Sequence, residues 1–253
     1  MQIRAKCRGA TMHRWLRAVL LLTYLALASG CSNGNDPTKS DLVSSGAGSG
    51  GIRWEMPALP GQLVFASVAR DGRLIIRSSG VWAGRIEASG REFDGEIVPY
   101  EHLAGPWLRA YEGARISGEF DDGFRAWIES DGLRAEVVVN YEALEPADPS
   151  FATIAGTYQV NIASSGGQVY TLVMTFDTLG VVTGSDTAGC GYYGRLAIID
   201  PGQSIYDLDL EASACGQLSG EYHGLVTQLE GGIFLTVINA EYALNVAFAR
   251  TGP

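Results

Sequence analysis

In the second half of the chain, apolar and polar residues alternate with a period of two along short runs. In the clearest run, YALNVAFA at 242–249, the large apolar side chains fall on one side and the small or polar ones on the other. This period is that of a β-strand with one buried face. Eight such runs follow one another, at 156–163, 168–177, 180–186, 190–199, 204–212, 218–228, 233–239 and 242–250.

The turns between these runs are short and rich in Gly, Asp, Ser and Pro, as in SSGG, DTLG and DPGQ. No segment longer than about ten residues shows an apolar stripe at helical spacing, which argues against a parallel sheet with crossover helices. We therefore expect an all-β chain whose strands form an antiparallel meander, closed into a small eight-stranded barrel because closure removes exposed edges. A β-sandwich built from the same strands is the alternative.

The chain also repeats itself. The pentapeptide ISGEF at 116–120 returns as LSGEY at 218–222, and 80–97 can be laid over 180–196 with several glycines in register. The sequence thus predicts two tandem diverged copies of one barrel unit, at 53–145 and 152–253. The Pro- and acid-rich stretch between them, EALEPADPS, marks the boundary. A helical turn is the alternative for the segment 100–114, but its position opposite the second copy's fifth strand favours a strand, so we expect it to supply the first copy's fifth strand.

The first thirty residues have the layout of an export signal, with five cations before residue 18, a short apolar run and small residues at its end. The ending LALASGC resembles the bacterial lipoprotein signal, which implies cleavage before Cys31 and lipidation of that cysteine. A non-lipidated leader cut near Ser29 or Gly30 is the alternative. Ser32 resembles the position that directs Gram-negative lipoproteins to the outer membrane, so we expect a lipid anchor there, facing the periplasm. Residues 31–52, rich in Gly and Ser, are expected to be a flexible tether.

Charge limits the partners of the exported body. The formal charge of the whole chain is −10, and removing the five leader cations leaves 13 of the 18 basic residues against 28 acidic ones. Nucleic acid is therefore excluded as a partner, because binding it requires cationic patches. A basic protein is the kind of partner that this charge favours. The alternative is that the negative charge only keeps the exported protein soluble.

Two cysteines remain for the folded body, Cys190 and Cys215, and export to an oxidising compartment predicts a disulfide between them. If the flanking strands pair across the turn PGQS at 201–204, the numbers of facing residues sum to 405, as those of the two cysteines do. The bridge would contribute about 3 kcal/mol. A zinc pair is the rival interpretation, but no His or Cys stands nearby at ligand spacing.

The candidate site residues are carboxylates. Asp207, Asp209 and Glu211 are expected on the outer face of the strand YDLDLEA, where they would meet a basic partner or a cation, unless they are only a solvated face. Glu119 and Glu221 hold the same place in the two pentapeptides. Past the leader only His102 and His223 remain, and no nucleophile elbow is present. We therefore expect no enzyme, no cofactor and no metal.

The second copy, with GSDTAGCGYYGRLAIID, YDLDL and GEYHGL, resembles small exported lipoprotein domains of proteobacteria over about 152–250. The resemblance implies no activity, and the first copy, which lacks both cysteines, should be the less braced. Two functions lead: a lipid-anchored binding module for a basic envelope or secreted protein (an inhibitor, immunity or assembly factor, similar in plan to lipoprotein lysozyme inhibitors), or a lipocalin-like carrier of a small apolar ligand. A passive envelope component is a third.

Overall fold

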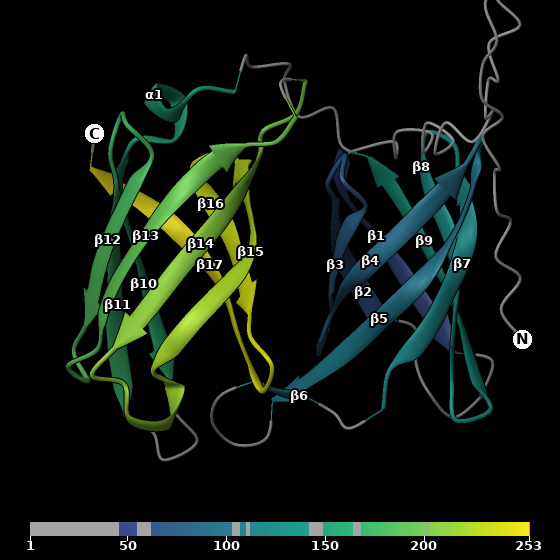
Figure 1. The fold of residues 1–253 in the computed structure, drawn as a ribbon, viewed down its shortest axis with the longest axis horizontal. Helices are drawn as coiled ribbons and strands as arrows, with labels where there is room; N and C mark the ends of the chain where they lie inside the picture. Colours follow the sequence, from purple (N-terminus) through teal and green to yellow (C-terminus); the bar gives the residue numbers. More distant parts are fainter. Residues whose placement is uncertain are drawn as a thin grey trace, which may run out of the picture. The chain divides into compact units, whose positions relative to one another are not determined.

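The computed structural model describes residues 46–54, 62–102, 107–109, 112–141, 149–163, 168–200 and 202–252. The leader, Cys31 and most of the expected tether lie outside the described residues. Within them the chain is nearly all β-strand, and its two halves form separate rings of strands (Figure 1).

The first ring consists of eight antiparallel strands in chain order. Each strand pairs with the next, and β9 pairs back with β1, so the ring is closed. The strands are β1 (Gly46–Trp54), β2 (Gln62–Val68), β3 (Arg73–Arg77), β4 (Val81–Ser89), β5 (Glu92–His102), β7 (Ala114–Phe120), β8 (Gly123–Ser130) and β9 (Leu133–Tyr141).

The second ring repeats this topology, with β17 pairing back with β10. All eight runs predicted from the period of two appear as strands. They are β10 (Gly156–Ala163), β11 (Val169–Phe176), β12 (Val181–Asp186), β13 (Gly191–Ile198), β14 (Ile205–Ser213), β15 (Gly220–Leu229), β16 (Gly232–Ile238) and β17 (Tyr242–Gly252). The prediction of two tandem eight-stranded meander barrels is confirmed, and the sandwich alternative is wrong.

Each ring encloses its own apolar core, supplied by every second residue of its strands. The first core contains Phe93, Phe120 and Phe124 among aliphatic side chains. The second contains Tyr158, Tyr206 and other large side chains that are almost fully buried. These side chains pack against one another in the middle of each barrel.

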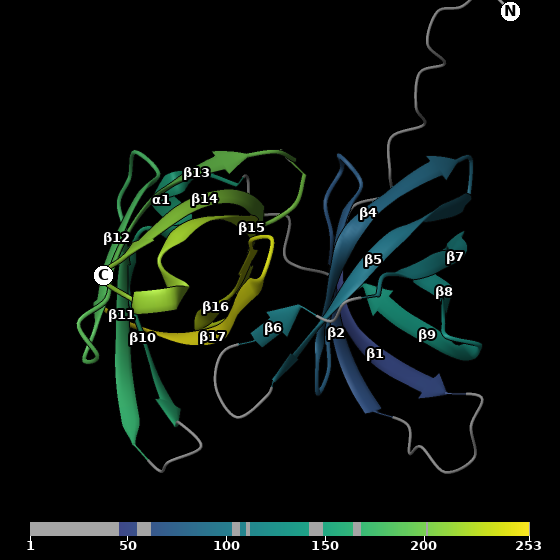
Figure 2. The ribbon, with the colours of Figure 1, turned by 60° about the horizontal axis from the view of Figure 1, so that its bottom comes forward.

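Two short helices close the ends of the second barrel. Helix α1 (Phe151–Ile154) is capped by Ser150, whose side chain accepts a hydrogen bond from the Thr153 amide, and it buries Ile154 completely in the core. The 3-10 turn η1 (Gly216–Leu218) follows β14 and accepts, through the Leu218 carbonyl, a hydrogen bond from the Tyr222 hydroxyl. Figure 2 shows this light-green turn lying across the opening of the ring.

Two boundary predictions in the first half are wrong. Residues 46–52 were expected in the tether, but they form most of β1, so the first barrel begins at Gly46 rather than at 53. Glycine and serine there do not prevent pairing, since β1 hydrogen-bonds to strands on both sides. The segment 100–114 does not supply the fifth strand of the ring. That strand is β5, of which the segment holds only the last three residues, and the segment also forms the short strand β6 (Trp107–Arg109), which pairs with β5 and with β17.

The residue register of the repeat is also wrong. Both pentapeptides reach the sixth strand of their ring, but ISGEF forms its end, whereas only GEY of LSGEY lies in the strand, at its start. Likewise 81–89 form a fourth strand and 181–186 a third. The two barrels share their topology, but the matched pentapeptides occupy different positions in it, because similar Gly-containing patterns suit several strands of a small barrel.

The predicted disulfide between Cys190 and Cys215 is present, with the two Cα atoms 4.8 Å apart. The predicted hairpin register is wrong by one residue, since facing residues sum to 404, as in Leu196 with Leu208. Directly paired residues of antiparallel strands share a face, and this register keeps both leucines in the core. Cys215 still reaches Cys190 because Ala214, with φ of 58°, turns the chain just beyond the ladder.

The outer faces of the two barrels meet at a buried junction. Its apolar part combines Ala47, Ile75 and Tyr100 from the first half with Ile205, Leu225 and Ala243 from the second, together with their neighbours. The Tyr100 hydroxyl donates to the Asn239 carbonyl at 3.0 Å, and the Arg109 amide donates to the Glu241 carbonyl at 2.8 Å. The two repeats are therefore joined by a packed interface as well as by the connecting chain.

Candidate binding face

Strand β14 orients its side chains as the sequence predicts. Tyr206, Leu208 and Leu210 are buried in the core, and the alternate residues Asp207, Asp209 and Glu211 face outward. The period of two alone produces this separation, because successive side chains of a strand point to opposite faces. The three carboxylates nevertheless do not form one site.

Asp207 belongs to the junction between the barrels. It forms an ion pair with Arg73 of β3, which also bonds Asp71 at 2.9 Å, and the Asp207 side chain is only 24% exposed. The prediction that Asp207 shares a partner face with the other two acids is therefore wrong. No sequence pattern pointed to Arg73, which lies 134 residues from Asp207 along the chain.

Asp209 is engaged by the one histidine of the second barrel. Oδ1 of Asp209 lies 2.5 Å from Nδ1 of His223 on the neighbouring strand, and both side chains are largely exposed. In the part of the chain that the structure describes, His223 has no other hydrogen-bond partner, and no hydroxyl or thiol is positioned as a nucleophile for it. His102 ends β5, and its side chain lies outside the described residues.

Glu211 faces a second glutamate directly. The register of β14 and β15 places Glu211 opposite Glu221. Both are exposed, and neither carboxylate has a hydrogen bond or ion pair among the described residues. Like charges directly opposite on two strands are destabilising. The pair therefore does not serve the stability of the isolated barrel.

These residues line a surface hollow of about 300 Å³ on strands β13 to β15. Tyr193, which is 57% exposed, lies directly opposite Glu211, and Glu211 lies opposite Glu221, so these three side chains form one row across the strands. Arg195, Asp209 and His223 form the neighbouring row. Gly194 lies beneath the hollow. A Cβ atom at Gly194 would stand 2.4 Å from the Asp209 carbonyl oxygen, so the strands approach each other here as only glycine permits.

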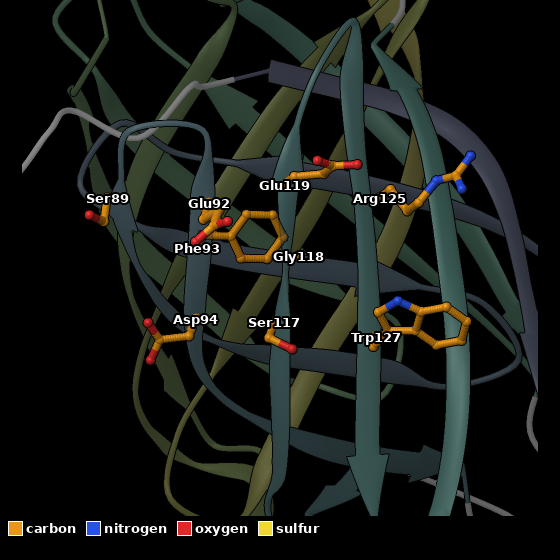
Figure 3. A pocket seen from close by; sticks show the side chains of 9 residues that line it. All are labelled: Ser89, Glu92, Phe93, Asp94, Ser117, Gly118, Glu119, Arg125 and Trp127. Atoms are coloured by element: carbon orange, nitrogen blue, oxygen red, sulfur yellow. The ribbon is translucent and has the colours of Figure 1, made fainter.

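The first barrel carries a similar hollow, of about 420 Å³, on β5, β7 and β8 (Figure 3). Here Glu92 stands directly opposite Glu119 on one side, and Arg125 of β8 stands opposite Glu119 on the other. The Glu119 carboxylate has no hydrogen bond or ion pair among the described residues. Gly118 lies on β7, the middle strand of the three, and a Cβ atom added there would stand 2.1 Å from the Arg125 carbonyl oxygen. Trp127 forms one wall, and the Arg134 guanidinium stacks over its ring at 4.0 Å.

Both hollows thus combine an opposed glutamate pair between the fifth and sixth strands of the ring with an aromatic wall. The pairs do not occupy the same height, since Glu92 begins β5 whereas Glu211 lies near the end of β14. Glu119 and Glu221, singled out from the pentapeptides, each line one hollow. Their partners Glu92 and Glu211 lie on strands that only the pairing of the ring brings beside them.

Sequence reasoning missed the most unusual charged residue, Arg77. It ends the apolar strand RLIIR and is 5% exposed, at the junction between the barrels. Its Nε donates to the Thr236 hydroxyl at 2.7 Å and to Oδ1 of Asn245 at 3.1 Å, and its Nη1 donates to the Ser67 hydroxyl at 3.2 Å. Burial lowers the pKa of Arg77 to about 9. The Arg77 guanidinium is therefore buried at the junction with only neutral hydrogen-bond acceptors, and its Nη2 atom has no hydrogen-bond partner.

Among the described residues no group of three His, Cys, Asp or Glu side chains could hold a metal ion. None of the helices in that part of the chain is long and apolar enough to cross a membrane. No protein-family model, curated protein or solved structure matches the chain.

Proposed function

We propose that this chain is a lipid-anchored binding module of the outer membrane, facing the periplasm, that engages a basic partner protein through the hollow on β13 to β15. The observation that carries the proposal is the opposed pair Glu211 and Glu221. An arrangement that costs the free protein stability is accounted for if a cationic side chain enters between the two carboxylates.

The rest of the hollow suits such a partner. Tyr193 offers an exposed aromatic face on which an arginine or lysine side chain can stack. The net negative charge of the chain would speed the encounter with a basic surface. Surface binding is also favoured over carriage of a ligand inside the second barrel. Large buried side chains fill that core, and the hollow at its η1 end measures about 40 Å³, room for about one water molecule.

The test is capture of envelope proteins on the chain, purified in detergent with its own N-terminus and compared at low and high salt. We expect one basic protein to be retained at low salt and released as salt rises. Glu211→Gln combined with Glu221→Gln should weaken its retention at least tenfold. The matched control, Glu92→Gln combined with Glu119→Gln, removes the same charge from the first barrel and should leave retention unchanged.

Equal loss in both double variants would assign binding to net charge rather than to this hollow. Retention of no protein under any condition, with lipid co-purifying instead, would contradict the proposal and favour the carrier.

A further inference from the structure

The second barrel is closed by a very short ladder. Strands β10 and β17 pair at Thr157 with Gly252, Tyr158 with Arg250, and Gln159 with Ala249, with a register shift after the first pair. Beyond Gln159 the two strands have no further pairing, although β10 continues to Ala163 and β17 begins at Tyr242. Figure 2 shows them meeting near the C-terminus and running apart from there.

Backbone groups of both strands face this gap. The Arg250 amide donates to the Gly231 carbonyl on the β16 side, so even-numbered residues of β17 face β16 and odd-numbered ones face the gap. Asn245 and Ala247 therefore present their N–H and C=O groups to it.

The same reasoning applies to β10. Gln159, paired with Ala249, faces β17, and the regular pairing of β10 with β11 then turns Asn161 and Ala163 toward the gap as well. The gap is thus bordered by two unpaired strand edges.

One end of this edge already accepts an added strand. Strand β6, from the first half of the chain, pairs antiparallel with the start of β17, Leu108 with Tyr242 and Trp107 with Ala243. The unpaired edge of β17 continues directly from that pairing.

Apolar side chains border the gap. Val160 of β10 and Leu244 of β17 are only half-buried, and Ile162 of β10 is 36% exposed. A strand entering the gap would set alternate side chains against them.

We propose that this gap is a β-augmentation site, where an extended segment of a partner protein with apolar residues at alternate positions adds as a strand between β10 and β17. Main-chain hydrogen bonds to the four gap-facing residues would hold it, and the alternate apolar side chains would complete the core. This surface is separate from the glutamate hollow and does not rest on the function proposed for it.

Hydrogen exchange of the free protein is the first test. The amides of Asn161, Ala163, Asn245 and Ala247 should exchange with solvent at least a hundredfold faster than the amides that hydrogen-bond between β1 and β9. That ladder closes the first barrel and is paired from Gly48 to Trp54. Comparable protection in both places would mean that the gap is closed, and would overturn the proposal.

Binding of a defined peptide is the second test. The probe is an acetylated and amidated nine-residue peptide of alternating valine and threonine with a lysine at each end, and its control carries proline at the central position. We expect the probe to bind and to slow exchange of the four gap amides at least tenfold, and the control to do neither. Failure of the probe to bind would overturn the proposal. Protection of these amides by dimerisation of the chain alone would replace the partner by a second copy.

Ala247→Pro removes one gap-facing N–H and should weaken binding of the probe at least tenfold, whereas Ala247→Thr, which keeps that N–H, should bind as the unchanged protein does. Equal binding by both variants would place the probe elsewhere and overturn the proposal. Thermal unfolding of both variants identifies a loss that comes from misfolding.

Discussion

The two barrels share a topology but are held closed in different ways. In the first, β1 and β9 pair without interruption from Gly48 with Tyr141 to Trp54 with Ala135. In the second, three pairs join β10 to β17, while a disulfide braces β13 to the end of β14, and α1 and η1 cover the two ends. The expectation that the first copy is less braced is correct for covalent bonds and wrong for the closing ladder.

The first barrel thus relies on a long closing ladder, whereas the second combines a short ladder with a disulfide and covered ends. The distribution of aromatic residues allows the two halves to be followed separately. All five tryptophans precede residue 128, whereas seven of the eleven tyrosines follow residue 150. Tryptophan fluorescence therefore reports on the first barrel, and tyrosine absorbance mainly on the second.

The largest effect is expected at the junction. Arg77→Ala would remove the hydrogen bonds that Ser67, Thr236 and Asn245 accept from the guanidinium and open a void between the barrels, which should cost about 3 to 5 kcal/mol of unfolding free energy. We expect the tryptophan and tyrosine signals, coincident in the unchanged protein, to separate into two transitions in urea. Arg77→Met, which keeps the volume, is the control. Coincident transitions in the alanine variant would show that the junction does not couple the barrels.

Removal of the disulfide should affect mainly the second barrel. Cys190→Ala combined with Cys215→Ala frees a loop of 25 residues and should lower the stability of that barrel by about 3 kcal/mol. The tyrosine transition should move to lower urea concentration, and the tryptophan transition should move less. An equal shift of both signals would mean that the barrels unfold only together.

Alkaline pH should also distinguish the halves. Burial raises the pKa of Tyr158, Tyr192, Tyr206 and Tyr222 in the second barrel, and of Tyr100 and Tyr141 in the first. A raised pKa in the folded state means that stability is unaffected below about pH 10, the ordinary value, and falls as pH rises above it. Urea titrations between pH 8 and 11 should show a steeper loss for the second barrel. A steeper loss in the first would contradict this assignment.

The smallest effect is a gain. Glu211→Gln should relieve the repulsion from Glu221 and raise stability by a few tenths of a kcal/mol, and Glu92→Gln should do the same opposite Glu119. Both gains should shrink at high salt, because exposed charges are screened. A loss of stability in either variant would mean that its glutamate has a structural role, and would weaken the argument for that hollow.

The sequence by itself determined the class of fold, the position of every strand in the second half, the outward direction of the β14 carboxylates and the pairing of Cys190 with Cys215. These follow from the period of two and from the cysteine count, which are local or nearly local properties. The same period could not fix the start of β1 or the register of the repeat, since glycine-rich segments carry little alternation.

Only the tertiary structure decided which charges meet. Arg73 forms an ion pair with Asp207, and Arg77 is buried at the junction. Each opposed glutamate pair forms because the pairing of the ring sets two neighbouring strands in one register. The short ladder between β10 and β17 is likewise a property of the closed ring. The alternation of a single strand specifies its faces, but its neighbours depend on how the whole sheet twists, coils and meets its own first strand.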